Sequence, residues 1–370
     1  MKLLALLFFL AALATACPPL FNDFYYLGNE THSTASLVRD LFKQQPQLGW
    51  SEIVTMTGKP LSTWPTGKIA YCFDQPKTRN NLESDLKEAW KVWHDKLGDA
   101  SQANSHKLRW LEFAFWDKEW PYCFLERHSP SDPWVWNPIV PYSVAMIMEW
   151  ETRLPNMAPS SVIGYIPQDW QRGNAEGRMG MRLNLHQAGD FHNHQHWIAA
   201  LAHELGHIFG LYHEHQRPDR DHWVRFNCAA LPGYDRAKEM VTREGNHDMK
   251  EVCSNGALAA TYSFGAVKSF DTIPHLDPGS EHVGKDWWWF QHYADRDYDD
   301  QSIMHYDSDA DYWRNDDELL RVRLAKWHKR GADFNPPTKF SKDDLEYCYV
   351  NFQPSQKDVD GIKKLYPWSG

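Results

Sequence analysis

Residues 203–221 of this chain read HELGHIFGLYHEHQRPDRD, and their spacing predicts a metal site built on a helix. His203 and His207 are four residues apart, so on a helix both imidazoles leave the same face and can share one metal ion. Gly210 can adopt a positive φ, which ends the helix and folds the chain back. That reversal allows His213 to supply a third nitrogen.

This ligand set favours catalytic zinc. Structural zinc is usually closed by four protein ligands, whereas three neutral imidazoles leave a fourth position open. Glu204 is placed to take a proton from a zinc-bound water, whose pKa the metal lowers. The chain contains 19 histidines, so chance is the alternative, but the pattern arises by chance only on the order of once in several thousand such chains. We therefore expect one Zn2+ ion per subunit, held by His203, His207 and His213.

Two further segments relate this site to a known protease family. Glu214 and then residues 215–221, HQRPDRD, follow the third histidine directly. Residues 299–306 read DDQSIMHY and contain Met304 and Tyr306. Alone, such a methionine and tyrosine are more often core packing. Together with the zinc pattern, which metzincin proteases share, the segments resemble the astacin family (peptidase family M12A), whose members carry Glu and an R-x-D-R-D run after the third histidine and an S-I-M-H-Y methionine turn.

The resemblance implies a role for each of these residues. Met304 forms the apolar floor of the site, and Tyr306 is a switchable fifth ligand that stabilises the oxyanion together with zinc. Glu214 helps to hold the new N-terminus of the mature enzyme through a buried, water-linked ion pair. A solvated charge beside a ligand histidine is the alternative for Glu214. The implied reaction is hydrolysis of peptide bonds, in which Glu204 takes the proton of water and returns it to the leaving amine.

The resemblance also implies an α+β fold. The N-terminal subdomain of a metzincin or astacin-like catalytic domain has a twisted, mostly parallel sheet with an antiparallel edge strand and long helices. The C-terminal subdomain is irregular, and zinc lies in the cleft between the two. Residues 64–71, WPTGKIAY, match the W-P-x-G-x-I-x-Y opening of mature astacin domains. Similarity thus runs, with gaps, from about Trp64 to Tyr366.

Local patterns place the first elements of this fold. Alternating polarity predicts a strand over residues 68–72. Apolar residues at helical spacing then predict a helix that begins near Asn80 or Asn81 and stops at Gly98. Its apolar stripe consists of Leu82, Leu86, Trp90, Trp93 and Leu97.

Later patterns place the edge of the sheet and the end of the domain. Residues 161–164 resemble the edge strand to which substrate adds as an antiparallel strand, with an ordinary hairpin as the alternative. The next strand is expected over 181–185. Ser355 and Asp358 predict the cap of a closing helix, whose inward residues are Val359, Ile362 and Leu365.

The start of the chain indicates secretion. An apolar run from Leu3 to Ala14 is too short to span a bilayer as a helix and ends in the small-x-small sequence Ala14-Thr15-Ala16. A buried N-terminal helix is the alternative, but the run has no polar residues at helical spacing. The net charge of −10 argues against a nucleic-acid partner. We expect a secreted, extracellular protein without stable membrane insertion that acts on proteins or peptides.

These features divide the chain into a signal peptide (1–16), a pro-segment (17–55) and a metalloprotease domain (56–370). Insertions are expected near 118–160, 228–290 and 308–340. Astacin pro-segments commonly silence zinc through the aspartate of an F-x-G-D motif, but residues 26–29 here read YLGN. A neutral amide is a poorer zinc ligand than a carboxylate, and Asn29 also begins the N-x-T sequon. The aspartate switch is therefore doubtful.

The chain has six cysteines, an even number that suggests disulfides in a secreted protein. Cys228 and Cys253 flank a polar stretch, and we expect them to pair. Removal of the pro-segment with Cys17 leaves five cysteines, so three arrangements are open. Cys17 tethers the pro-segment by a disulfide, which we favour, or one thiol stays free, or Cys17 itself caps the zinc.

Other clusters have structural and functional interpretations. Residues 134–136 (WVW) and 287–289 (WWW) suggest sugar binding by aromatic stacking, although packing is favoured. His192, His194 and His196 suggest a second metal, although solvated histidines are favoured. The acidic run 295–300 suggests calcium, which ranks low. A catalytically silent zinc protein and a glycan-binding protein are the rival functions to a metalloendopeptidase.

Overall fold

The computed structural model describes residues 63–115, 119–129, 131–149, 159–165, 180–183, 193–217, 220–271, 298–308 and 319–369. Two antiparallel hairpins precede them, formed by β1 (Phe24–Leu27) with β2 (Glu30–Ser33) and by β3 (Thr55–Met56) with β4 (Lys59–Pro60). The expected signal peptide, Cys17, Asn29 and residues 287–289 lie outside the described residues. The division of the chain at residue 56 stays a prediction.

The N-terminal half contains a five-stranded sheet with the order β6-β5-β7-β9-β8. The neighbouring strands β5 (Lys68–Phe73), β6 (Arg109–Glu112), β7 (Ala145–Glu149) and β9 (Gly180–Leu183) run parallel. β8 (Ser160–Ser161) pairs antiparallel with β9 and lies at the edge. The predicted α+β class and mostly parallel sheet with an antiparallel edge strand are confirmed. The edge strand predicted over 161–164 is wrong in its bounds, because β8 covers Ser160–Ser161 and shares only Ser161 with the prediction.

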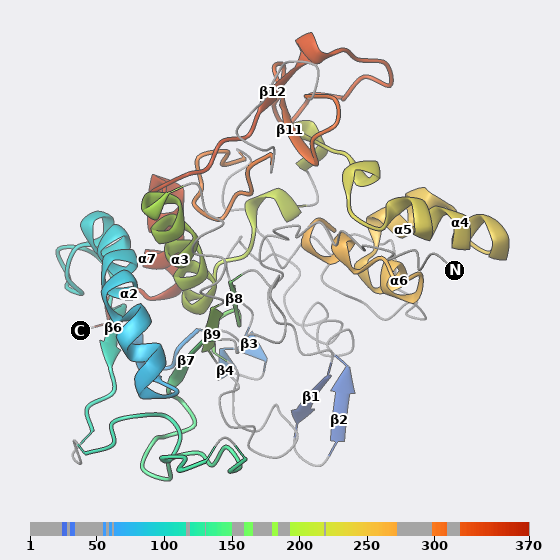
Figure 1. Ribbon diagram of the computed structural model, residues 1–370. Coiled ribbons are helices and arrows are strands. Elements are labelled where there is room, and N and C mark those ends of the chain that lie inside the picture. The colour runs from blue at the N-terminus through green and yellow to red at the C-terminus, as the bar shows by residue number, and fades with distance from the viewer. Residues whose placement is uncertain are drawn as a thin grey trace, which may run out of the picture.

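Two long helices, α2 (Pro76–Leu97) and α3 (His194–Phe209), lie against each other beside this sheet (Figure 1). Their buried apolar residues share one core with the sheet strands. The predicted start of α2 near Asn80 or Asn81 is wrong by about one turn. The helix begins at Pro76, because the fixed φ and missing N–H of proline suit a first helical turn. Its predicted end at Gly98 is confirmed, with a φ of 70°.

The closing helix α7 (Gln356–Leu365) returns the end of the chain to the same core. The Asp358 N–H donates to Ser355 Oγ at 3.0 Å, and the Ser355 N–H donates to Asp358 Oδ2 at 2.9 Å. The predicted cap is thus confirmed as a capping box. The predicted inward residues, Val359, Ile362 and Leu365, are all buried.

The C-terminal half has a second core and consists of shorter elements. Its antiparallel sheet has the order β10 (Val224–Phe226), β11 (Leu324–Trp327) and β12 (Leu345–Tyr347). Its described helices before α7 are η3 (Glu214–Gln216), η4 (Arg220–His222), η5 (Cys228–Ala230), α4 (Tyr234–Glu244), α5 (Met249–Ser254), α6 (Gly256–Thr261), η6 (Gly265–Ser269) and η9 (Lys342–Asp344).

Two disulfides connect cysteines of the described chain. The predicted Cys228–Cys253 bond is confirmed, and it links η5 to α5. Cys72 and Cys123 form a second bond, which sequence reasoning left open. Cys348 is buried with a free thiol. If Cys17 tethers the pro-segment within this chain, Cys348 is therefore the cysteine left for it.

The tryptophans near residue 135 differ in environment. Trp136 is buried and donates from Nε1 to Val140 O at 2.8 Å, which agrees with the favoured packing role. Trp134 is 38% exposed, and the Arg127 guanidinium lies 4.2 Å from its ring centroid. A face of this ring is thus occupied by a cation.

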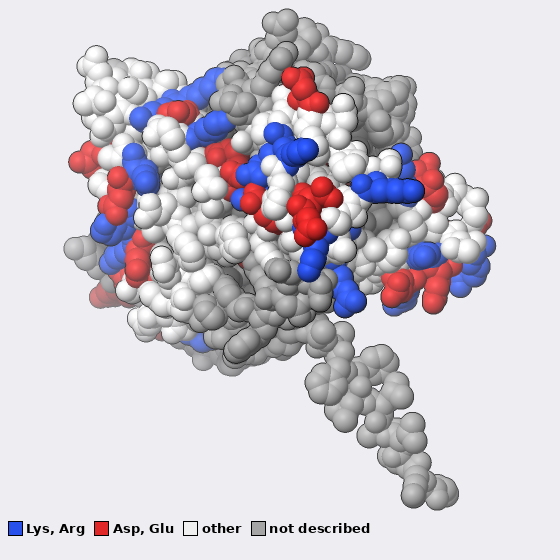
Figure 2. Space-filling view, turned by 90° about the horizontal axis from the view of Figure 1, so that it is seen from above, with Lys and Arg blue, Asp and Glu red and all other residues white. Residues whose placement is uncertain are grey.

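The surface and the helices bear on possible partners. On the face seen in Figure 2, described Lys and Arg side chains lie among Asp and Glu side chains and do not gather into one large basic patch. Within the described residues, no helix combines the length and apolar character that crossing a membrane requires.

Candidate metal centre

The three predicted zinc ligands come together at the C-terminal end of α3. Gly210 ends this helix in the left-handed conformation, with a φ of 107°, as predicted. The chain then turns back, and His213 Nε2 lies 2.9 Å from His207 Nε2 and 3.1 Å from His203 Nε2. Among the residues that the structure describes, these three side chains are the one group of three or more His, Cys, Asp or Glu suited to hold a metal.

Two of the ligand rings are oriented by backbone carbonyls. His203 Nδ1 lies 2.7 Å from Ile303 O, and His207 Nδ1 lies 2.8 Å from Leu211 O. Because a carbonyl oxygen only accepts, each Nδ1 carries the proton and each Nε2 keeps its lone pair. Both Nε2 atoms are therefore prepared to bind a metal at the common centre.

The third ring is oriented by Gln216, which sequence reasoning did not single out. Gln216 Oε1 lies 2.6 Å from His213 Nδ1, while Gln216 Nε2 donates to Asp271 O at 3.0 Å. The amide is therefore held with its oxygen toward the histidine. The position of Gln216, three residues after His213, was the available indication in the sequence that it contacts this ligand. Its partner Asp271 is distant in sequence, so the contact that fixes the amide could not be inferred.

The chemistry of the donor set fits zinc. Burial lowers the pKa of His203 to about 4 and lowers the pKa values of His207 and His213 well below their ordinary value. All three imidazoles are thus neutral, which is the form that binds metal. Three neutral nitrogens without a fourth protein ligand are typical of a catalytic zinc site.

Glu204 lies beside the ligands and is only 2% exposed. Its Oε2 contacts the hydroxyl of Ser161, which also lies 3.0 Å from Glu204 O. Ser161 belongs to the edge strand β8. The strand that the family resemblance assigns to substrate pairing therefore also contacts the predicted general base.

Tyr306 lies next to the ligand rings, on the side of the second core. Its ring centroid is 4.3 Å from that of His213 and 5.9 Å from that of His203. It stacks on His215 at 4.0 Å, and the Tyr306 N–H donates to His215 Nδ1 at 3.4 Å. His215 Nε2 in turn donates to Ser269 O at 2.8 Å, so this ring is fixed. His215 is a second residue that sequence reasoning missed.

Met304 packs against α3 at Gly206, the residue before the predicted ligand His207. A Cβ placed on Gly206 would collide with Met304 Sδ, and it would lie 3.1 Å from Trp93 Cζ2. The close approach of helix and methionine therefore requires a glycine at this position. Met304 itself is buried in the first core.

We expect Gly206→Ala to destabilise the protein by about 1–3 kcal/mol through overpacking against Met304 and Trp93, despite the higher helix propensity of alanine. Chemical denaturation measures the free energy of unfolding. Gly265→Ala is the matched control, because a Cβ there meets nothing within 4 Å. An unchanged stability of Gly206→Ala would contradict the close packing of Met304 under the helix.

Glu214 is buried, so the alternative of a solvated charge is wrong. Its Oε1 accepts from Arg217 Nη1 at 2.8 Å and from the Asp299 N–H at 2.9 Å. Burial is the main reason that the pKa values of Glu214 and Asp299 are raised. Two carboxyl groups thus lie close together in a buried place with one guanidinium.

The other histidines before α3 make separate contacts. His194 Nε2 lies 3.1 Å from Glu88 Oε2, and its side chain is 60% exposed. The His196 N–H donates to the capping side chain of Asn193 at 3.1 Å. His192 lies outside the described residues. The described contacts therefore do not favour a second metal site here.

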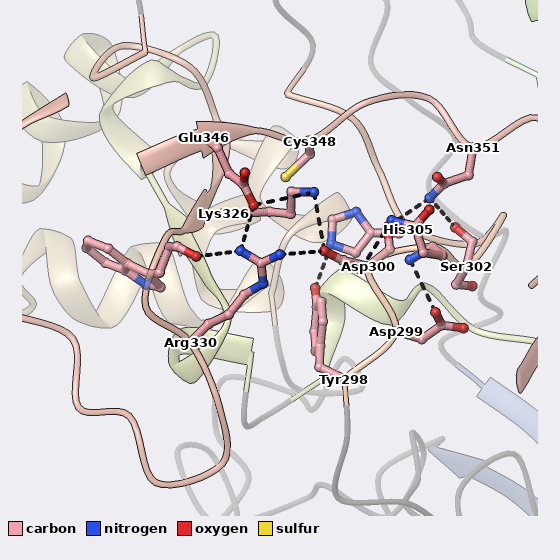
Figure 3. A network of polar contacts seen from close by, with 12 residues as sticks. Tyr298, Asp299, Asp300, Ser302, His305, Lys326, Arg330, Glu346, Cys348 and Asn351 are labelled. Carbon is pink, nitrogen blue, oxygen red and sulfur yellow. Dashed lines mark hydrogen bonds and ion pairs between the residues drawn. The ribbon is translucent and has the colours of Figure 1, made fainter. Parts of the chain in front are cut away.

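The described end of the acidic run 295–300 contacts two cations, one on β11 and one just after it (Figure 3). Asp300 Oδ2 lies 3.2 Å from Lys326 Nζ and 3.2 Å from Arg330 Nη2. Arg330 also pairs with Glu346 at 2.6 Å. Asp300 thus has the partners of a structural ion-pair network and not the environment of a calcium ligand.

Comparison with known proteins shows which family part of this chain resembles. Residues 180–271 match the family model described as Astacin (Peptidase family M12A). Zinc metalloproteinase nas-3 of Caenorhabditis elegans is 31% identical over 109 residues, which are 29% of this chain and 33% of that protein. The chain therefore matches about a third of the length of this relative.

Two solved structures align over most of this chain. Myroilysin aligns with a TM-score of 0.36 and 13% identity over 84% of this chain and 97% of that chain. High choriolytic enzyme 1, a hatching enzyme zinc-protease from the medaka fish Oryzias latipes, aligns with a TM-score of 0.35 and 14% identity over 83% of this chain and 93% of that chain. The segment that matches the family model contains the three ligand histidines, Glu204 and Glu214. Over residues 180–271 this chain is similar to the astacin family.

Proposed function

We propose that this protein is a secreted zinc-dependent metalloendopeptidase that hydrolyses peptide bonds in proteins. One observation carries the proposal: three ligand Nε2 atoms converge, with 2.9 and 3.1 Å between neighbours, at a helix end where Glu204 is buried beside them. A carboxylate next to a three-histidine centre is the arrangement needed to activate water at a metal.

Each residue has a defined part in the proposed reaction. The three histidines would hold Zn2+, which when bound would lower the pKa of a water at the open position. Glu204 takes a proton from that water and returns it to the nitrogen of the leaving amine. The hydroxyl of Tyr306 donates to the substrate carbonyl oxygen as negative charge develops there. β8, at the edge of the sheet, pairs with the extended substrate backbone.

Hydrolysis of casein and of fluorogenic peptides tests this function. We expect activity in the processed protein, loss of activity with a zinc chelator and recovery when Zn2+ is added back. Zinc uptake without hydrolysis would instead favour a catalytically silent zinc protein. Binding to a polysaccharide column that survives zinc removal, in a protein without peptidase activity, would favour a glycan-binding protein.

We expect Tyr306→Phe to lower kcat by about 10²–10³-fold with little change in KM, because the hydroxyl acts on charge that develops in the transition state. The phenylalanine ring can keep the stacking on His215, so the fold and zinc content should stay as in wild type. Steady-state kinetics measure the effect. Tyr349→Phe, at a tyrosine that is 66% exposed, is the control. A rise in KM at unchanged kcat would contradict the assigned role.

We further propose that residues 1–16 direct secretion and that the pro-segment, residues 17–55, is removed. The two disulfides support an oxidising compartment. The buried carboxyl groups of Glu214 and Asp299 support binding of a new N-terminal ammonium, because a second cation beside Arg217 would stabilise both charged forms.

Mass spectrometry of the secreted product identifies its N-terminus and decides whether residues 17–55 are lost. Non-reducing and reducing gels decide the role of Cys17. A pro-segment fragment that separates from the domain only after reduction supports the tether. A fragment that separates without reduction excludes the tether, and the free thiol and the zinc cap remain as the two arrangements.

A further inference from the structure

One zinc ligand is connected to the last helix of the chain through the methionine turn, residues 299–306. The His203 Nδ1–H donates to Ile303 O at 2.7 Å. This carbonyl belongs to the peptide between Ile303 and Met304. The N–H of the same peptide donates to Ser302 Oγ at 3.0 Å. Both polar groups of one peptide are thus used, one by the ligand histidine and one by a serine hydroxyl.

The hydroxyl of Ser302 continues this path to Asp358. Ser302 Oγ donates to Asp358 Oδ1 at 2.6 Å. The other carboxylate oxygen, Oδ2, accepts from the Ile303 N–H at 2.9 Å. Ser302 is 2% exposed and Asp358 is 3% exposed, so water does not compete for these bonds. The path runs from histidine to peptide to hydroxyl to carboxylate, and every donor points the same way.

We propose that Asp358 is a positioning residue of the zinc centre, which acts on His203 through Ser302 and the Ile303–Met304 peptide. Ligand histidines commonly donate their second N–H to a carboxylate or a carbonyl, which fixes the ring and raises its basicity. Here a carboxylate polarises the carbonyl through a chain of hydrogen bonds, which strengthen one another in a buried place. The inference rests on the proposed function, since it assumes that His203 binds zinc.

The methionine turn is held firmly enough to transmit this effect. Asn351 Nδ2 donates to Asp300 O at 3.0 Å and to Ser302 O at 2.8 Å, as Figure 3 shows. Lys326 on β11 and Arg330 just after it pair with the Asp300 carboxylate. If the Ser302 hydroxyl is lost, these contacts still hold the turn in place, so the Ile303–Met304 peptide cannot move together with the His203 ring.

His203 differs from the other two ligands in this respect. His207 and His213 are oriented by Leu211 and Gln216, which lie within a few residues of them in sequence. The orientation of His203 depends on α7, at the other end of the chain. The packing of α7 against the core is thus coupled to the ability of the three histidines to bind zinc.

Two serine variants separate this role from helix capping. Ser302→Ala breaks the path to His203 but leaves the reciprocal bonds of the capping box. Ser355→Ala is the matched control, because it removes the side chain of the helix cap and leaves the path intact. Ser302→Thr keeps a hydroxyl and should restore wild-type behaviour.

Zinc affinity of the full processed protein, measured by competition with a chromophoric chelator, is the decisive quantity. We expect Ser302→Ala to weaken zinc binding about 10–100-fold, and Ser355→Ala to lower the Tm but leave zinc affinity within about twofold of wild type. The Nδ1–H proton resonance of His203 should shift upfield in Ser302→Ala alone, because its hydrogen bond weakens.

The outcomes distinguish the two proposals. Suppose that the wild-type protein binds zinc. If Ser302→Ala then has the same zinc affinity, or if both serine variants lose zinc affinity equally, the role of Asp358 is overturned and the proposed function stands. Wild-type protein that binds no zinc overturns the metal centre and the path together. If Ser302→Ala does not fold, Ser302→Thr decides: zinc affinity of wild-type strength supports the path, and affinity weakened about 10-fold or more refutes it.

Discussion

Glu204→Gln is expected to abolish measurable peptide hydrolysis, with a loss of about 10²–10⁴-fold or more, while zinc content and fold are retained. The amide has the shape of the carboxylate and can still accept from the Ser161 hydroxyl, so the buried site is not disrupted. It cannot take a proton from water at neutral pH. Initial rates on a fluorogenic peptide, together with zinc content by atomic absorption, measure both parts of this prediction.

Glu88→Gln is the matched control for that substitution. Glu88 is about half exposed on α2, where it contacts His194, and it lies outside the zinc centre. We expect wild-type rates from this control. Substantial turnover by Glu204→Gln would show that another group takes the proton, and loss of zinc from this variant would show that the carboxylate itself helps to hold the metal.

His207→Ala is expected to lose zinc and, with it, all hydrolysis. The side chain is fully buried and supplies one of the three nitrogens of the proposed zinc centre. Zinc affinity should therefore fall by more than the roughly 10–100-fold that loss of a hydrogen-bond partner of a ligand costs. Metal titration and circular dichroism separate this loss from unfolding, because the variant should keep the helical spectrum of the zinc-free wild type.

His194→Ala makes the same change at an exposed histidine on α3. Because His194 contacts Glu88 and no ligand, the control should keep one zinc per chain and full activity. A stoichiometry of two in wild type that falls to one in His194→Ala would instead establish the second metal site. Full zinc retention by His207→Ala would refute the three-histidine centre.

Local sequence was sufficient for much of the site and of the fold. The spacing of His203 and His207 defines a helix face, and Gly210 provides the positive φ that ends the helix. The capping box of α7 and the stop of α2 at Gly98 are equally local, because each depends on groups within a few residues. The start of α2 at Pro76 was missed, since asparagines further along also suit a cap.

Contacts between distant segments could not be obtained in this way. The bond from His203 to Ile303, the contact of Glu204 with Ser161 and the packing of Met304 on Gly206 each join residues far apart in the chain. The sequence by itself predicted the proposed ligands, the proposed general base and the helix and turn that carry them, because these depend on spacing within one helix and one turn. Only the tertiary structure decided how those groups are oriented, because orientation depends on which distant carbonyls, hydroxyls and rings the folded core brings beside them.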